Sequence, residues 1–231
     1  VFSNGITSSF GSLIFSNDKK ALKNAFSNYE YFYMIVLFCI YTCCAVLLLP
    51  FVKIYTAEVT DGVQYVRQNI AFLFVILGLV QNIRIPSLTM ICAAGHFKET
   101  QGRAILEAAI NIVVSLALIK PLGMAGILFG TVVSYSYRSI DCIIYNNKYL
   151  VNGTLVLSLR RIVRNVAVSL LTVFAVHKFL SPDPQSLLGW LMWAVITAVI
   201  SGVLIVAVNA AVEPAQLKQL FERGKSALKR V

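Results

Sequence analysis

The sequence is poor in charged residues, and acidic residues are the scarcest of them. Charged side chains make up 13% of the 231 residues, with 10 Asp and Glu against 20 Lys and Arg and a net charge of +10. A soluble domain usually has about a quarter of its residues charged. In addition, 58% of the residues are hydrophobic and the mean hydropathy is +0.77. The low charge and the high apolar content together exclude an ordinary soluble domain. We expect the lipid bilayer to surround most of this chain.

Catalytic and metal-binding signatures are also missing. His96 and His177 lie far apart without a paired Ser or Asp, and no HExxH, P-loop or CxxC motif occurs. The five cysteines all fall in apolar segments without the spacing of a metal site, so we interpret them as packing residues. They are Cys39, Cys43, Cys44, Cys92 and Cys142. The sequence predicts no catalytic residue, no metal site and no cofactor.

The basic residues have no aromatic residues interleaved on one face, so nucleic acid is not an expected partner. They occur instead in short runs between apolar stretches, an arrangement that suits anionic lipid headgroups. If the loops alternate between two sides, fourteen Lys and Arg fall on one side and four on the other. The first group is Lys19, Lys20, Lys23, Lys98, Arg103, Lys148, Arg160, Arg161, Arg164, Lys218, Arg223, Lys225, Lys229 and Arg230, and the second is Lys53, Arg67, Lys120 and Lys178. The positive-inside rule then places the C-terminus in the cytoplasm.

Long apolar runs are what the chain does have. They predict an all-α integral membrane protein with about six full spans, at 31–50, 69–94, 104–119, 124–144, 162–180 and 187–209. Residues 1–16 are interpreted as the end of one more helix. The chain starts at Val1 without an initiator Met, and we expect it to be the C-terminal part of a longer protein.

Two amphipathic segments accompany these spans. Residues 17–29, capped by Asn17 or Asp18, are predicted to form a short helix on the membrane surface, and Pro50 is expected to end the span that follows. A basic amphipathic tail is expected after Pro214, with Leu217, Leu220, Phe221 and Leu228 on one face. Both segments are of the kind that binds anionic lipid.

Arg84 is the most informative candidate for a site. It lies about 15 Å along its span from the cytoplasmic end, close to the bilayer midplane, with Gln81 on the same face and Pro86 nearby. A charge at that depth normally faces a polar cavity or a partner. Three interpretations stay open: Arg84 and Gln81 bind an anionic substrate group, Arg84 forms an ion pair with Glu107 or Asp141, or the span is misplaced and Arg84 reaches the membrane surface.

Two further residues, Arg138 and Asn111, are candidates for lining the same cavity. Arg138 is three residues from Asp141, where an intrahelical ion pair is the alternative to substrate binding. Asn111 shares a face with Glu107 and Ser115, and either hydrogen-bonds to another helix or lines the cavity. Three glycines, Gly123, Gly126 and Gly130, form a strip that favours close helix packing.

Several runs resemble one known family. They are Pro-Phe-x-x-x-Tyr-Thr at 50–56, Ala-Gly-His-Phe-Lys-Glu-Thr-Gln at 94–101, Gly-x-x-Gly-x-x-x-Gly-Thr at 123–131 and Tyr-Arg-x-Ile-Asp at 137–141, with Asn111 and Ser115. These runs resemble the C-terminal half of Wzx-type polysaccharide and O-antigen flippases, in the superfamily that includes the MATE multidrug exporters. The resemblance covers roughly 1–150.

The resemblance implies a MATE-like helical bundle of two lobes. Residues 1–150 would form most of the C-terminal lobe, and 151–231 two appended helices with a basic cytoplasmic tail. Such proteins carry undecaprenyl-pyrophosphate-linked oligosaccharides across the bacterial inner membrane by alternating access, for capsule, O-antigen or exopolysaccharide. The partners that the resemblance implies are the lipid-linked oligosaccharide, polysaccharide polymerase machinery and a coupling ion, H⁺ or Na⁺. Two alternatives stay open: a MATE-type small-molecule antiporter, and a polytopic glycosyltransferase or ligase acting on the same lipid.

Overall fold

The regular structure of the chain is helical. The computed structural model describes residues 2–153, 155–219 and 222, and no strand occurs among them, which confirms the predicted all-helical fold. The helices are α1 (Phe2–Phe15), α2 (Lys19–Tyr55), α3 (Gln68–Ile83), α4 (Ile85–Ala93), α5 (Phe97–Leu122), α6 (Met124–Tyr145), α7 (Leu155–Ala175) and α8 (Leu187–Val212), with π-helical turns η1 (Asn146–Leu150) and η2 (Val176–Leu180).

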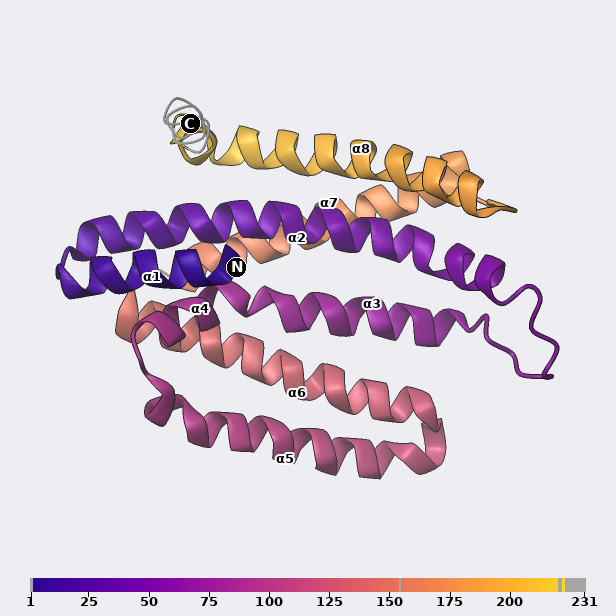
Figure 1. Ribbon diagram of the computed structural model, residues 1–231, viewed down its shortest axis with the longest axis horizontal. Coiled ribbons are helices and arrows are strands. Elements are labelled where there is room, and N and C mark those ends of the chain that lie inside the picture. The colour runs from indigo at the N-terminus through magenta and orange to yellow at the C-terminus, as the bar shows by residue number, and fades with distance from the viewer. Residues whose placement is uncertain (1, 154, 220–221, 223–231) are drawn as a thin grey trace.

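Five helical segments of the described chain are long and apolar enough to cross a membrane. They are Lys19–Tyr55, Gln68–Ala93, Phe97–Leu122, Leu155–Leu180 and Leu187–Val212. The helix at the remaining predicted span, α6, is not among them. In the chain α6 nevertheless connects the end of α5 to the start of α7, and α5 and α7 both start at the same end of the molecule (Figure 1). Helix α6 therefore runs from one end of the molecule to the other. Its polar residues lower its hydropathy, and they face the neighbouring helices α3 and α5.

The helices lie side by side with their axes roughly parallel (Figure 1). The α5–α6 hairpin and α8 are at opposite margins, with α2 and α3 between them, and α7 packs on α2 and α8. The α1–α2, α4–α5 and α6–α7 connections gather at the left in Figure 1, which we call the basic end. The α2–α3, α5–α6 and α7–α8 connections gather at the other end, which we call the far end. Consecutive connections between the long helices therefore alternate between the two ends of the molecule.

The first predicted span is wrong at both of its ends. Residues 19–55 form one helix of 37 residues, and no separate surface helix precedes it. Asp18 caps it as predicted, accepting a hydrogen bond from the Ala21 N–H at 2.9 Å. Pro50 does not end it, because the residues that follow are still apolar and a helix leaves fewer backbone groups unpaired beside lipid than a loop does.

Other predicted spans are shorter than the helices of the structure, and one reason explains them. Polar residues such as Lys98 and Arg103 were assigned to loops, but α5 already begins at Phe97 and α7 at Leu155, so the helices extend past their apolar parts. Pro121 falls between the predicted spans at 104–119 and 124–144, but α5 includes it. The turn is formed by Gly123, whose φ of 57° is a conformation that favours glycine.

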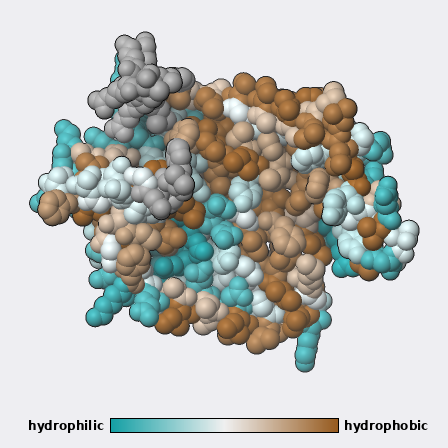
Figure 2. Space-filling view, viewed as in Figure 1, coloured by the Kyte–Doolittle hydropathy of each residue, from teal (hydrophilic) through white to brown (hydrophobic). Residues whose placement is uncertain are grey.

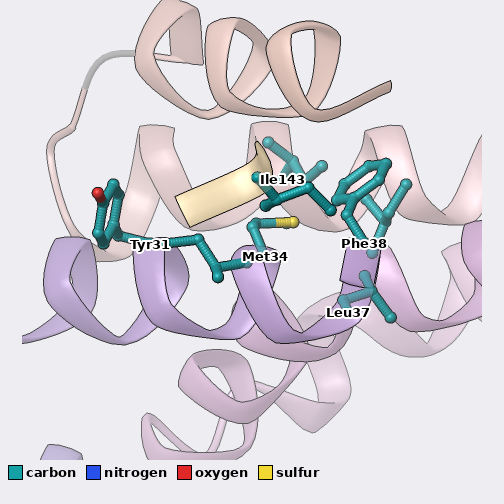
Figure 3. Close-up of a cluster of buried hydrophobic side chains, with 8 residues drawn as sticks. Tyr31, Met34, Leu37, Phe38 and Ile143 are labelled. Atoms are coloured by element: carbon teal, nitrogen blue, oxygen red, sulfur yellow. The ribbon is translucent and has the colours of Figure 1, made fainter. Parts of the chain in front are cut away.

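The core lies around α2. Met34 and Phe38 of α2 are each 1% exposed and meet Ile143 of α6, Ile83 of α3 and Ile205 of α8 (Figure 3). This cluster joins helices from both sides of the predicted boundary at residue 150. Of the predicted amphipathic tail, Leu217 packs against the same cluster. Leu220, Phe221 and Leu228 lie outside the described residues.

Candidate functional site

Arg84 stands at a break between two helices. It is the single residue between them, the C-cap of α3 and the N-cap of α4, because Pro86 has no N–H to continue the hydrogen-bond ladder. The Asn82 carbonyl, which would have been the acceptor for Pro86, accepts the Arg84 N–H instead. The break therefore holds the Arg84 side chain at a fixed position between α3 and the helices packed on it.

The side chains around this break form a continuous chain of charges across three elements. Arg84 Nη1 donates to Glu107 Oε1 of α5 at 2.7 Å, and Glu107 Oε2 is 3.6 Å from Arg138 Nε of α6. Arg138 Nη1 donates to Asp141 Oδ2 at 2.9 Å, and Asp141 also accepts from Arg103. We call these residues the five-residue charge chain. Three arginines face two carboxylates, so the chain carries one excess positive charge.

The charge chain is largely removed from the surface. The Arg84 and Glu107 side chains are each 16% exposed and the Arg138 side chain is 7% exposed. The Arg84 guanidinium also lies over the Tyr135 ring, 4.8 Å from its centroid, and its Nε is buried without a hydrogen-bond partner. Figure 2 shows a hydrophilic band that reaches inward from the basic end across an otherwise apolar face. Charges in this setting interact more strongly than charges in water.

The structure brings some of the predicted site residues together and separates others. Arg84 and Arg138 share Glu107, so the ion pair that the sequence left open for Arg84 is present, and the predicted Arg138–Asp141 pair is confirmed. Gln81 is exposed on the turn before Arg84. Asn111 lies four residues after Glu107 on α5 and donates to Thr131 and Ser134 of α6, each at 3.2 Å. Asn111 thus makes the hydrogen bond between helices, and its role in substrate binding stays a prediction.

A second cluster of buried charges was missed by the sequence analysis. Arg161 of α7, which was counted with the basic loops, is 1% exposed. Its guanidinium donates to Glu30 of α2 at 2.9 Å and to Glu213, just after α8, at 2.6 Å. Arg164 Nη1 lies 2.8 Å from the second oxygen of Glu213. Two arginines and two glutamates therefore neutralise one another where α2, α7 and the end of α8 meet.

Polar neighbours complete this second cluster. Ser158 donates to the free oxygen of Glu30 at 2.7 Å, and Asn209 of α8 donates to Asn165 of α7 at 2.7 Å. A signal for the cluster was present in the sequence. Glu30 falls next to Tyr31 and Met34 in a helix pattern that buries this face, and Asn209 interrupts a long apolar run. Polar residues inside membrane helices usually bond across helices.

Glu213 stays charged at this position. Burial by itself would raise the pKa of its carboxyl group, but hydrogen bonds and charge interactions with Arg161 and Arg164 outweigh burial and hold the pKa below its usual value. The two arginines therefore keep the α8 terminus attached through an ionised group.

A largely apolar cavity of about 940 Å³ lies toward the far end. Its walls come from the second half of α2, the start of α3 and the end of α7, and include Leu49, Phe72, Val75 and Phe174. Lys53 and Asp183, paired at 2.9 Å, stand at its edge. The cavity lies toward the far end of the molecule, whereas Glu213 and Arg161 lie toward the basic end.

No family model, no curated protein and no solved structure matches this chain. Fold and site together define a class, an all-helical protein with several helices of membrane-spanning length and composition and with paired charges between them. Among the described residues no group of three or more His, Cys, Asp or Glu is arranged to hold a metal ion. A more specific function has to be argued from the charge chain itself.

Proposed function

We propose that this chain is the C-terminal lobe, with two appended helices, of a Wzx-like flippase of the MATE-like superfamily. It carries undecaprenyl-pyrophosphate-linked oligosaccharides across the bacterial inner membrane and is a transporter, not an enzyme. The proposal starts from the sequence runs at 50–56, 94–101, 123–131 and 137–141. The structure adds one supporting observation, the excess positive charge of the five-residue charge chain at the Arg84 helix break.

An arginine that is already paired can still bind a substrate anion. Glu107 supplies one carboxylate to both Arg84 and Arg138, and the Arg84 Nε has no partner. A pyrophosphate carries more negative charge than one carboxylate and presents several acceptor oxygens, which suits the planar fork of donors on arginine. In the proposed cycle the pyrophosphate displaces Glu107 from Arg84, and Glu107 returns to Arg84 after release.

The MATE-type antiporter is supported less well. An exporter of organic cations needs an acidic residue free to meet the cation. The buried acids Glu30, Glu107 and Asp141 each face at least one arginine. A glycosyltransferase or ligase needs acids or bases on a large far-end loop. In the α2–α3 loop, Asp61 instead closes a local turn. It accepts hydrogen bonds from the Tyr65 hydroxyl and from the Val63 N–H, and these hold the pKa of its carboxyl below the usual value.

The test is a transport assay with the full-length protein. Cells that lack the gene should accumulate lipid-linked repeat units on the inner leaflet, and Arg84→Ala should reproduce this at normal protein levels. Surface polysaccharide should fall by about tenfold or more, because losing a hydrogen bond between charged groups costs about 1.5–3 kcal/mol. Arg84→Lys should restore part of it, since the charge is kept and the fork of donors is lost.

Arg67→Ala is the matched control. Arg67 is an exposed arginine at the other end of α3, and its side chain donates to the Gln64 carbonyl of its own loop. It should leave transport unchanged. Normal surface polysaccharide in the Arg84→Ala variant would remove Arg84 from the mechanism, and drug efflux by the full-length protein in vesicles would favour the antiporter.

A further inference from the structure

The residues that follow α8 fold back onto the basic end of the molecule. Leu217 packs against the core cluster around α2, and Asn28 of α2 donates to the Gln219 side chain at 3.0 Å. Glu213, at the start of this return, faces Arg161 and Arg164 of α7. Residues 213–219, which we call the return segment, are therefore attached at one point by charge and at two points by weaker contacts.

The charge cluster beneath the return segment has an inner and an outer half. In the inner half Arg161 and Glu30 are 1% and 3% exposed, and Arg161 also donates to the Ser27 carbonyl at 3.0 Å. In the outer half Arg164 and Glu213 are 9% and 14% exposed, and Glu213 also accepts a hydrogen bond from Arg161 Nη2 at 2.6 Å. If Glu213 departs, Arg161 and Glu30 still neutralise each other. The inner pair therefore does not need the return segment, whereas the return segment needs the outer pair.

The outer half is also polar on its other sides. Asn28, Tyr31, Arg164 and Gln216 each have a buried side-chain nitrogen or oxygen without a hydrogen-bond partner. Tyr31 lies under the Arg161 guanidinium, which is 5.4 Å from the ring centroid, and the Gln216 N–H donates to the Glu213 carbonyl at 3.2 Å. Asn28 contacts the return segment through Gln219. Donors and acceptors grouped in this way are the partners that bridging water molecules use. An ion pair with such neighbours opens at a lower cost than one sealed in apolar packing.

We propose that Glu213 forms a releasable ionic lock with Arg161 and Arg164, which holds the return segment against α2 and α7 and opens while the inner Arg161–Glu30 pair stays closed. The lock determines whether residues 213–219, with the basic residue Lys218, are held on the protein. This inference concerns the return segment alone and does not depend on the proposed transport function.

Limited trypsin digestion of the full chain in detergent tests the lock. Cleavage after Lys218, identified by mass spectrometry, requires the return segment to leave the surface, and its rate follows the population of the opened form. Glu213→Gln keeps the shape of the side chain and removes its charge. It should raise cleavage at this position by about tenfold, as the loss of a charged hydrogen bond predicts. Raising the salt concentration should speed cleavage of the wild type and have little effect on this variant.

Asp183→Asn is the control, because it removes a carboxylate charge and an exposed ion pair with Lys53 at the far end, away from the return segment. It should leave cleavage after Lys218 unchanged. Two outcomes would overturn the lock: an unchanged rate in the Glu213→Gln variant, or an equal increase at trypsin sites throughout the chain, which would mean that the cluster only maintains the fold.

Discussion

At the scale of single residues, the carboxylate partners of each arginine explain how charged side chains can lie among apolar helices. Arg161 is 1% exposed and has hydrogen bonds to two carboxylates as well as to Ser27. Arg138 is similarly held between Glu107 and Asp141. A buried charge without such partners would cost several kcal/mol, so each arginine depends on its carboxylates.

Arg161→Ala should therefore be severely destabilising. It leaves Glu30 buried without its counter-charge, and we expect a loss of about 3–5 kcal/mol in the free energy of unfolding. Denaturation in detergent, followed by circular dichroism, measures it. Arg160→Ala is the control, because Arg160 is exposed on the preceding position of the same helix and should change stability by less than about 0.5 kcal/mol. A double variant, Arg161→Leu with Glu30→Leu, should recover part of the loss. Equal stabilities for the Arg161→Ala and Arg160→Ala variants would contradict the pairing.

The sequence was a partial guide to these residues. Arg84 and Arg138 stood out because they fall inside apolar runs, and the Arg138–Asp141 pair follows from helical spacing alone. Arg161 did not stand out, because it is next to Arg160 at the start of a span, where arginines are usually solvated. Its burial depends on Glu30 and Glu213, which are 131 and 52 residues away in sequence. Local spacing carries no information about contacts of that range.

At the scale of elements, the α5–α6 hairpin is defined by glycines and a small polar ladder. A Cβ atom at Gly126 would lie 2.2 Å from the Leu118 carbonyl oxygen, and one at Gly130 would lie 2.3 Å from Ser115 Oγ. The two helices thus approach so closely that Asn111 reaches Thr131 and Ser134 across the interface. The predicted close packing of the glycine strip is confirmed at these two positions.

Gly126→Ala should push the two helices apart. The clash is with backbone atoms that cannot rotate away, so we expect a loss of about 1–3 kcal/mol, seen as a lower melting temperature in detergent. The matched control is Gly102→Ala on α5. A Cβ there has nothing within 4 Å, and alanine in place of glycine inside a helix should instead stabilise by about 0.5–1 kcal/mol. The same sign of change for both variants would mean that the interface adapts freely.

Element boundaries were predicted less well than element types. Pro50 is expected to end its span and Pro121 falls between two predicted spans, yet both lie inside helices. Proline weakens a helix, but beside lipid the alternative is unpaired backbone, and the helix continues. Only the combination at Arg84 and Pro86, where neighbouring helices supply polar partners, produces a real break.

At the scale of the whole molecule, the end at which each connection lies determines how many helices have to cross the membrane. Five segments meet the criteria of length and apolarity, and α6 does not. Yet α5 ends at the far end and α7 begins at the basic end (Figure 1). Helix α6, which lies between them in the chain, therefore runs back from the far end to the basic end. The polar side chains of α6 are compatible with this because they are bonded to α3 and α5: Ser139 donates to the Val80 carbonyl at 2.7 Å, and Arg138 contacts Glu107.

Labelling of single cysteines with a membrane-impermeant maleimide tests this arrangement in intact cells. Thr60→Cys, Lys120→Cys and Gln185→Cys replace exposed far-end residues and should react without permeabilisation, because the fourteen-to-four distribution of basic residues predicts that this end is outside. Lys98→Cys and Lys148→Cys, exposed at the basic end, should react only after the membrane is opened. The unmodified chain, whose native cysteines lie in helices, gives the background. Because Lys120 and Lys148 flank α6, labelling of both from the same side would show that α6 does not cross, and reversal of all five results would place the basic end outside.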